Sequence, residues 1–389
     1  MSLLLDKRGF AKRLRADSEE NRNKLFSWGI FMNRKLLAVA VSTALAMPMA
    51  AHAVKFKTSG QVNRAIQYGD DGQGSDVLHV DGDASGSRVR FVGSEDLGNG
   101  MKVGFTMEIE AQSNDSFNAT LKASDWGFKH GERHINMWFS GNWGKVTMGQ
   151  ASDAMDGVAF ADLNGAWIPV ENASDFGGSI AFRTSAGGTA GGITAGSVTP
   201  SYDGGRRDVL RYDSPSLGPF KAMVSVANND QWDAQVRLGG SVGGGEYDLR
   251  GGYGARQNRN GYDMWTFSGA FKFSQGTSVA LAYGESDFDG AQADGDYFYV
   301  KVGHDWGNNS VAIDYKTADD TTAHSFCSGG SCGGETFGIG FVHTMPKPKV
   351  DLYVGYRNFE LDDWSTALSG GAGADDVDVF FVGSRVKFD

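Results

Sequence analysis

The stretch Met101-Lys-Val-Gly-Phe-Thr-Met-Glu-Ile-Glu110 alternates apolar and polar side chains from one end to the other. Every second residue from Met101 onward is apolar, and the positions between them include a lysine, a threonine and two glutamates. A period of two is the period of a β-strand, in which successive side chains point to opposite faces. The stretch therefore predicts a strand with one face in an apolar medium and the other in water.

The same alternation returns in Trp265–Phe273, in Val350–Tyr356 and at the carboxyl end, in Val377–Asp389. In the last of these, Arg385 and Lys387 oppose an apolar face made of Phe380, Val382, Val386 and Phe388. Such a face either packs against a second sheet, as in a soluble sandwich, or lies against lipid. The connections between the strands help to distinguish these two folds.

Short turns and longer polar loops alternate along the chain. The short ones are rich in Gly, Asn and Pro, which suit tight bends. The seven turns are Gly98–Gly100, Gly141–Gly144, Ser216–Pro219, Gly243–Gly245, Ser274–Gly276, Gly307–Asn309 and Pro346–Pro348. The eight loops are Gly69–Ser87, Ser113–Glu132, Ala151–Gly205, Asn228–Asp233, Gln257–Gly261, Asp287–Gly295, Ala318–Gly334 and Glu360–Asp376. These fifteen connections predict sixteen strands, with short turns at one end and long loops at the other.

This arrangement is typical of an all-β fold, the antiparallel transmembrane β-barrel. Aromatic residues beside the turns favour the same interpretation, because they would form a belt at the membrane interface. Each of them alone is equally compatible with core packing, so the preference rests on the group together with the asymmetry of the connections. These residues are Trp143, Phe220, Tyr247, Phe273 and Trp306.

The amino-terminal part is expected to lie outside the barrel. A basic segment begins at Met32, the apolar run Leu36–Met47 follows, and Ala51-His52-Ala53 matches a cleavage site, which is the pattern of a Sec-type signal peptide. No comparable apolar run of about 20 residues occurs after it. The expected organisation is a mis-assigned start or a cytoplasmic extension over 1–31, a signal peptide over 32–53 and the barrel over 54–389.

The composition argues against nucleic acid as a partner. The chain has 47 acidic and 36 basic residues, a net charge of −11, and loss of the basic leader would make it more acidic. No catalytic pattern stands out, because the histidines lack metal-ligand spacing and no Gly-x-Ser-x-Gly elbow occurs. We therefore expect no enzymatic activity.

The cysteines Cys327 and Cys332 are expected to form a small disulfide at a loop tip, since an exported chain meets an oxidising compartment. A metal site there would need two more ligands, and only His324 is nearby. The pairs Asp287-Phe-Asp289 and Asp294-Gly-Asp296 offer oxygen ligands for Ca²⁺. Their spacing matches no EF-hand loop, so solvated acidic loops are favoured and no cofactor is expected.

Several stretches together resemble the Gram-negative general porins, the trimeric sixteen-stranded outer-membrane family. They are Ser59–Ile66, Ser87–Gly100, Phe139–Gln150, Ser174–Ser179 and Arg211–Phe220. The resemblance implies a homotrimer in outer-membrane lipid and lipopolysaccharide, with a water-filled pore for small hydrophilic solutes. It also implies a third loop that folds into the barrel. Members usually end on an aromatic residue, whereas here Phe388 is followed by Asp389.

The third long loop, 151–205, would then narrow the pore. Strand phase points Arg88, Arg90, Arg207 and Arg211 into the barrel, where we expect them to face the loop acids Asp156, Asp162, Glu171 and Asp175. Opposed charges of this kind would set up a transverse field and an ion preference. The pair Gly177-Gly178 would let the loop turn close to the wall. Gly187–Gly196 is expected to leave the pore or to form a small hairpin, so the constriction would lie between Asp153 and Phe182.

The sequence is also compatible with other functions. A substrate-selective channel for sugars or anions would have the same fold, and Trp167, Phe176, Tyr297 and Tyr299 could line a sugar track. An outer-membrane enzyme and a soluble glycine-rich β-sandwich are less favoured alternatives. A passive diffusion channel explains most of the pattern.

Overall fold

The computed structural model describes residues 55–122, 127–228, 230–256, 261–288, 294–323 and 325–389. The predicted extension 1–31 and signal peptide 32–53 lie outside these ranges. All elements named below belong to the unit Ala53–Asp389.

Within the described residues, seventeen strands form one sheet in which every strand pairs antiparallel with its neighbours. The first seven are β1 (Lys55–Asp70), β2 (Ser75–Asp81), β3 (Arg88–Gly98), β4 (Met101–Ser113), β5 (Phe128–Gly141), β6 (Gly144–Ser152) and β9 (Arg206–Asp213). The remaining ten are β10 (Phe220–Ala227), β11 (Trp232–Val242), β12 (Gly245–Arg256), β13 (Tyr262–Lys272), β14 (Thr277–Phe288), β15 (Gly295–Trp306), β16 (Asn309–Ala323), β17 (Ser331–Met345), β18 (Val350–Leu361) and β20 (Val377–Phe388).

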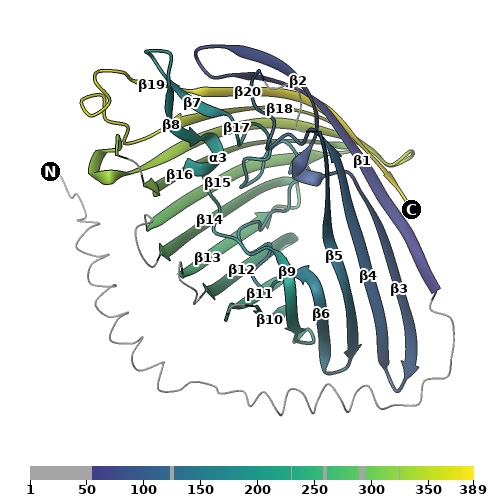
Figure 1. Ribbon diagram of the computed structural model, residues 1–389. Coiled ribbons are helices and arrows are strands. Elements are labelled where there is room, and N and C mark those ends of the chain that lie inside the picture. Colours follow the sequence, from purple (N-terminus) through teal and green to yellow (C-terminus); the bar gives the residue numbers. More distant parts are fainter. Residues whose placement is uncertain (1–54, 123–126, 229, 257–260, 289–293, 324) are drawn as a thin grey trace, which may run out of the picture. The chain divides into compact units, whose positions relative to one another are not determined.

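The sheet closes on itself because β20 pairs with β1 along Gly60–Asp70 (Figure 1). Strand β1 also pairs with β2 over Arg64–Asp70 and with β3 over Lys55–Gln61. Strands β2 and β3, separated by the short helix η2 (Asp83–Ser85), therefore share one position in the barrel. The result is the predicted closed barrel of sixteen strand positions.

The faces of the strands confirm the predicted phase. On β13 the outward Phe267 is 60% exposed, whereas its neighbours Thr266 and Ser268 are buried inside. On β4 the apolar Met107 and Ile109 point outward and Glu108 points inward. Apolar side chains on the exposed face and charged side chains on the buried face invert the arrangement of a soluble protein. This inversion is what a barrel in lipid requires.

All seven predicted turns connect adjacent strands. Residues with positive φ occur where the bends need them, as at Asn99 and Gly243. Several of the predicted loops contain more strand than expected. Gly69–Ser87 includes all of β2, and Ala318–Gly334 includes the end of β16 and the start of β17. Polar outer ends of strands resemble loops in sequence, because ladder hydrogen bonds rather than apolar side chains hold them.

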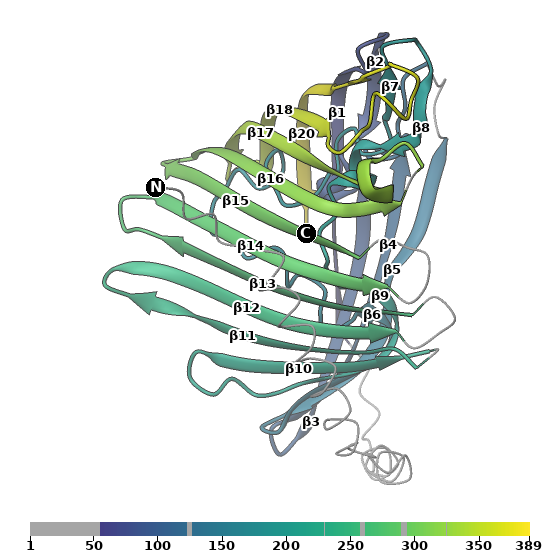
Figure 2. The same ribbon diagram turned by 90° about the vertical axis from the view of Figure 1, so that its left-hand side faces the viewer.

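A second, three-stranded sheet lies at the long-loop end of the barrel. It contains β7 (Ala181–Thr184), β8 (Thr189–Thr194) and, from the last loop, β19 (Ala374–Asp375). Strands β7 and β8 form a hairpin that begins earlier than the one considered for Gly187–Gly196, because its first strand precedes that range. Figure 2 shows β7 and β8 beside β2. An ion pair of 2.7 Å between Arg183 and Asp71 supports this neighbourhood.

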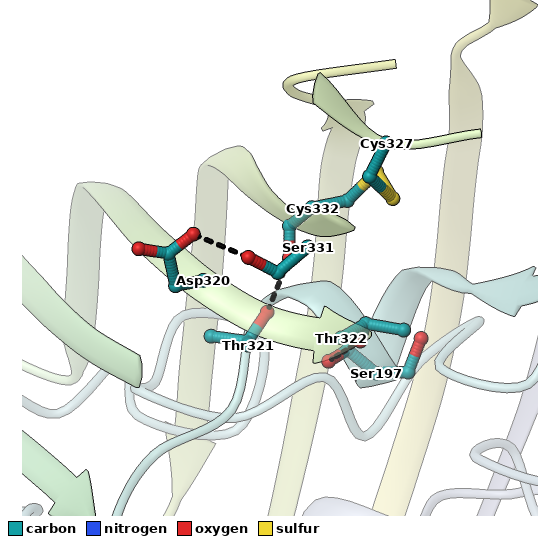
Figure 3. Close-up of a disulfide and its surroundings, with 7 residues drawn as sticks. All are labelled: Ser197, Asp320, Thr321, Thr322, Cys327, Ser331 and Cys332. Atoms are coloured by element: carbon teal, nitrogen blue, oxygen red, sulfur yellow. Dashed lines mark hydrogen bonds between the residues drawn. A yellow bond between two sulfur atoms is a disulfide. The ribbon is translucent and has the colours of Figure 1, made fainter. Parts of the chain in front are cut away.

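The Sγ atoms of Cys327 and Cys332 are bonded to each other at the outer end of β17 (Figure 3). The short helix η3 (Ser328–Gly330) lies within this small ring. Next to it, the hydroxyl of Thr322 donates a 3.0 Å hydrogen bond to the carbonyl of Ser197, at the helix α3 (Ala195–Val198). The ends of β16 and β17 thus contact the loop that precedes β9.

Helices contribute little, and among the described residues none is long and apolar enough to cross a membrane. The largest cluster of buried apolar residues includes Phe176, Phe182 and Val170 of the segment 151–205, packed with Tyr353 and Phe381 of the wall. The core of this protein is therefore formed largely by a loop packed against the inside of the sheet.

Candidate functional site: the loop inside the barrel

Loop 3, residues 151–205, leaves β6 and returns to β9, and its two ends are fastened to each other. The amide of Asp153 donates to the carbonyl of Gly205 (2.8 Å), and the amide of Gly205 donates to the carboxylate of Asp153 (3.0 Å). Arg207 forms a 2.6 Å ion pair with the same carboxylate, which is fully buried. These contacts close the base of the loop.

Asp203 forms a second closure slightly further into the loop. Its carboxyl oxygens accept hydrogen bonds from the amides of Gly157 (2.8 Å) and Ala159 (2.9 Å). Burial, and then the neighbouring Asp156, raise the pKa of Asp203 to about 8. The group is therefore largely a neutral carboxylic acid at pH 7.

Apolar side chains of loop 3 pack on the wall formed by β18 and β20. The ring of Phe176 stacks on that of Phe381, with centroids 3.8 Å apart and an angle of 1° between the planes. Tyr353 meets Phe176 edge-on at 6.1 Å. Because Tyr353 and Phe381 are inward-facing residues of the barrel, the loop lies inside it.

Cations of the wall hold loop 3 through its main-chain carbonyl oxygens. Lys301 of β15 donates to Val170 (2.6 Å), and Lys316 of β16 donates to Asn172 (3.2 Å) and Thr199 (3.0 Å). Further contacts of this kind come from Arg357 to the carbonyls of Glu171 and Ala173, from Arg250 to Gly157, and from Arg211 to Ser152 and Asp153.

The four predicted arginines fall into two groups. Arg88 and Arg90 of β3 both pair with Glu108 of the adjacent strand β4, rather than with an acid of the loop. Arg207 and Arg211 of β9 do contact the loop, but at its base. Arg207 binds the carboxylate of Asp153, and Arg211 binds carbonyls there and pairs with Asp213 at 2.8 Å.

The four predicted loop acids are likewise divided. Asp162 forms a 2.7 Å ion pair with Lys301 of β15 and not with an arginine of β3. Glu171 is buried near Asp175, and burial followed by the charge of Asp175 raises the pKa of Glu171 well above its ordinary value. Asp156 lies near Asp203 at the base. The expected direct opposition of these acids and the four arginines is thus replaced by separate clusters.

Gly177 and Gly178 lie where the loop approaches the wall. Gly177 has φ +82°, and a Cβ there would come within 2.5 Å of Val379 on β20. At Gly178 a Cβ would come within 2.5 Å of the carbonyl of Ser174. A close turn against the wall therefore requires residues without side chains at both positions.

The ion clusters of the inner wall carry more cations than acids. Glu108 and Glu110 are shared by three arginines, Arg88, Arg90 and Arg133. Three further aspartates each have two cationic partners. These clusters are Asp213 with Arg211 and Lys221, Asp248 with Arg237 and Arg250, and Asp351 with Arg385 and Lys387. The wall inside the barrel is therefore locally positive although the chain as a whole is acidic.

Sequence reasoning missed the cations that touch the middle of the loop, Lys301, Lys316 and Arg357. Strand phase contains the signal for Lys301, because Val300 and Val302 face outward on either side of it. The alternation along a strand does not predict where the loop carbonyls lie, because their positions depend on contacts between residues more than a hundred positions apart in sequence.

The acidic pairs considered for Ca²⁺ lie partly outside the described residues, since Asp289 is not among them. In the described part of the chain, no group of three or more His, Cys, Asp or Glu side chains is arranged to hold a metal ion.

A closed barrel with a lipid-facing apolar surface and a charged, loop-bearing interior defines a membrane channel. A family model described as Gram-negative porin matches residues 37–363. The chain belongs to this family, and it forms an outer-membrane channel for the passive diffusion of small hydrophilic solutes.

Solved structures share the fold at low sequence identity. An anion-selective porin from Comamonas acidovorans is 18% identical with a TM-score of 0.59, covering 86% of this chain and 100% of its own. OmpF of Salmonella typhi, in complex with daunomycin, is 14% identical with a TM-score of 0.57 and coverages of 88% and 100%. OmpT of Vibrio cholerae in a trimer form is 13% identical with a TM-score of 0.55 and coverages of 87% and 100%. No curated protein matches the sequence.

Proposed function

We propose that loop 3 sets the narrowest section of the diffusion pathway and that the pore prefers small anions over small cations. The observation that carries this proposal is the excess of cations in the inner-wall clusters, above all the three arginines around Glu108 and Glu110. Fixed charges lining a narrow pore raise the local concentration of ions of opposite sign.

Loop 3 itself adds less negative charge than its sequence suggests. The pKa of Asp203, raised to about 8, keeps this group largely protonated near neutral pH, and burial shifts the pKa of Glu171 in the same direction. Asp153 and Asp162 are each paired with a cation. The acids of the loop therefore leave the positive character of the wall largely intact. The many acids in the outer loops account for the net charge without lining this section.

The test is the reversal potential of single channels in a planar bilayer under a KCl gradient. We expect the wild type to favour chloride, and the variant Arg88→Gln/Arg90→Gln to lower the chloride-to-potassium permeability ratio by at least about twofold. The control Lys349→Gln removes a cation from a short turn outside the clusters and should leave the ratio unchanged. A wild-type channel that favours potassium, or an unchanged ratio in the double variant, would contradict the proposal.

We further propose a homotrimer that is exported by a signal peptide and embedded in outer-membrane lipid and lipopolysaccharide. The solved trimer form of OmpT, which has the same fold, supports the assembly. The outward apolar residues, such as Phe267, Leu281 and Phe380, support lipid contact. In the recordings just described, a trimer is expected to close in three equal conductance steps per inserted unit.

A further inference from the structure

Lys316 is unusual among the wall cations because its ammonium group is buried without an acidic hydrogen-bond partner in the described structure. The side chain is 1% exposed, and Nζ donates to the carbonyls of Asn172 and Thr199, with Pro200 at 3.5 Å. The ammonium also lies 5.6 Å from the centroid of the Tyr297 ring. Its donors are thus directed at main-chain oxygens.

The two carbonyl partners belong to different branches of loop 3. Asn172 lies within the expected constriction segment Asp153–Phe182, and Thr199 lies after α3, on the branch that returns to β9. One buried ammonium therefore joins two segments that are 27 residues apart in sequence (199 − 172). A carbonyl oxygen that loses a buried donor is left with an unsatisfied polar atom, which is costly.

The neighbouring cations act in the same manner on the first branch. Lys301 donates to Val170, and Arg357 donates to Glu171 and Ala173 while pairing with Asp314 at 2.6 Å. Together with Lys316 they hold the four consecutive carbonyls from Val170 to Ala173. Because every residue has a main-chain carbonyl, these contacts do not depend on which side chains the loop carries.

We propose that Lys316 is a positioning residue that fixes loop 3 inside the barrel through its backbone, so that the place of the loop does not depend on the charges of its acids. This inference rests on the proposed role of loop 3 as the constriction. According to this inference, two properties of the channel are determined by different groups of residues. The wall cations on carbonyls set the position of the loop, and the ion clusters and loop acids set the ion preference.

The experiment compares Lys316→Met, Lys316→Gln and Lys221→Met as full-length, folded barrels. Methionine removes all donors of Lys316, whereas glutamine keeps N–H donors but not the charge. Lys221 is the matched control, because it is an inner-wall lysine that pairs with Asp213 and is 41% exposed. Folding is checked by the heat-dependent shift in gel mobility.

Two readouts are needed. The first is amide hydrogen exchange over residues 168–176 and 197–203, and the second is single-channel current noise. We expect Lys316→Met to speed exchange at least about tenfold in both segments, the loss of a buried hydrogen bond being the cause, and to increase noise. Lys316→Gln should give an exchange rate and a current noise closer to those of the wild type. Lys221→Met should change neither the exchange rate nor the noise, although it should alter the ion preference.

An unchanged rate of amide exchange in Lys316→Met overturns the inference. An equal increase in the exchange rate in Lys221→Met overturns it as well. Faster exchange with unchanged current leaves the positioning role standing and contradicts the proposed constriction instead. If Lys316→Met does not fold, Lys316→Gln decides by the same readouts. Failure of both to fold counts against the inference, since a residue that only positions a loop is not required for barrel closure.

Discussion

Asp203 shows how a single carboxyl group can make loop 3 sensitive to pH. Its pKa of about 8 lies above the value of about 4 expected for the unfolded chain, because it is buried near Asp156 and Asp153. A group whose pKa rises on folding keeps its proton in the folded state. Stability is therefore lost progressively as the pH rises from about 4 through about 8.

We predict that the base of the loop loosens as Asp203 ionises. Open-channel current noise of the wild type should increase between pH 6 and pH 9, with a midpoint near 8. In Asp203→Asn the side chain cannot ionise, so the rise of the noise with pH should disappear, whatever the noise level at pH 6. The same rise in both proteins would show that another group is responsible.

The outer end of β17 is joined to the last loop. The amide of Ser328 donates to the carbonyl of Asp363 (2.6 Å), and the rings of Phe326 and Trp364 meet at 5.4 Å. The bond between Cys327 and Cys332 closes the small ring that presents these groups. The ring lies on the loop side of the barrel, away from the narrow section proposed for the pore.

We predict that the disulfide stabilises this outer structure and not the pore. Closing so short a ring is worth about 2 kcal/mol by chain entropy, confined here to the loop. Cys327→Ser/Cys332→Ser should therefore increase proteolytic cleavage between residues 325 and 331 and leave single-channel conductance unchanged. The unreduced wild type should take up no thiol label. Labelling of the wild type, or a changed conductance in the variant, would contradict this.

The strands were predictable because each carries its own alternation. The phase of Met101–Glu110 depends only on neighbouring residues, and the outward Met107 and Ile109 follow from it. The partners of the charged residues were not predictable in the same way. Arg88 faces Glu108 because of the register between β3 and β4, and Asp162 reaches Lys301 through the fold of the whole loop.

The barrel as a whole has its polar groups inside and its apolar groups outside. The interior is filled by loop 3 on the side of β16, β17, β18 and β20, where Phe176, Phe182 and Val170 are buried. The clusters around Glu108 and Asp213 lie on other strands, β3, β4, β5, β9 and β10. A solute pathway between loop 3 and these cation-rich strands agrees with the place where the loop packs and with the strands that carry the clusters.

In our proposal this pathway is a water-filled pore narrowed by loop 3. The most direct measurement is single-channel conductance in the presence of neutral polyethylene glycols of increasing size, for the wild type and for Lys316→Met. We predict that small polymers enter and lower the conductance, that large ones do not, and that the size limit is sharp in the wild type and shifts upward when the loop is loosened. A protein that conducts no current, or a size limit that is the same in both channels, would contradict the account.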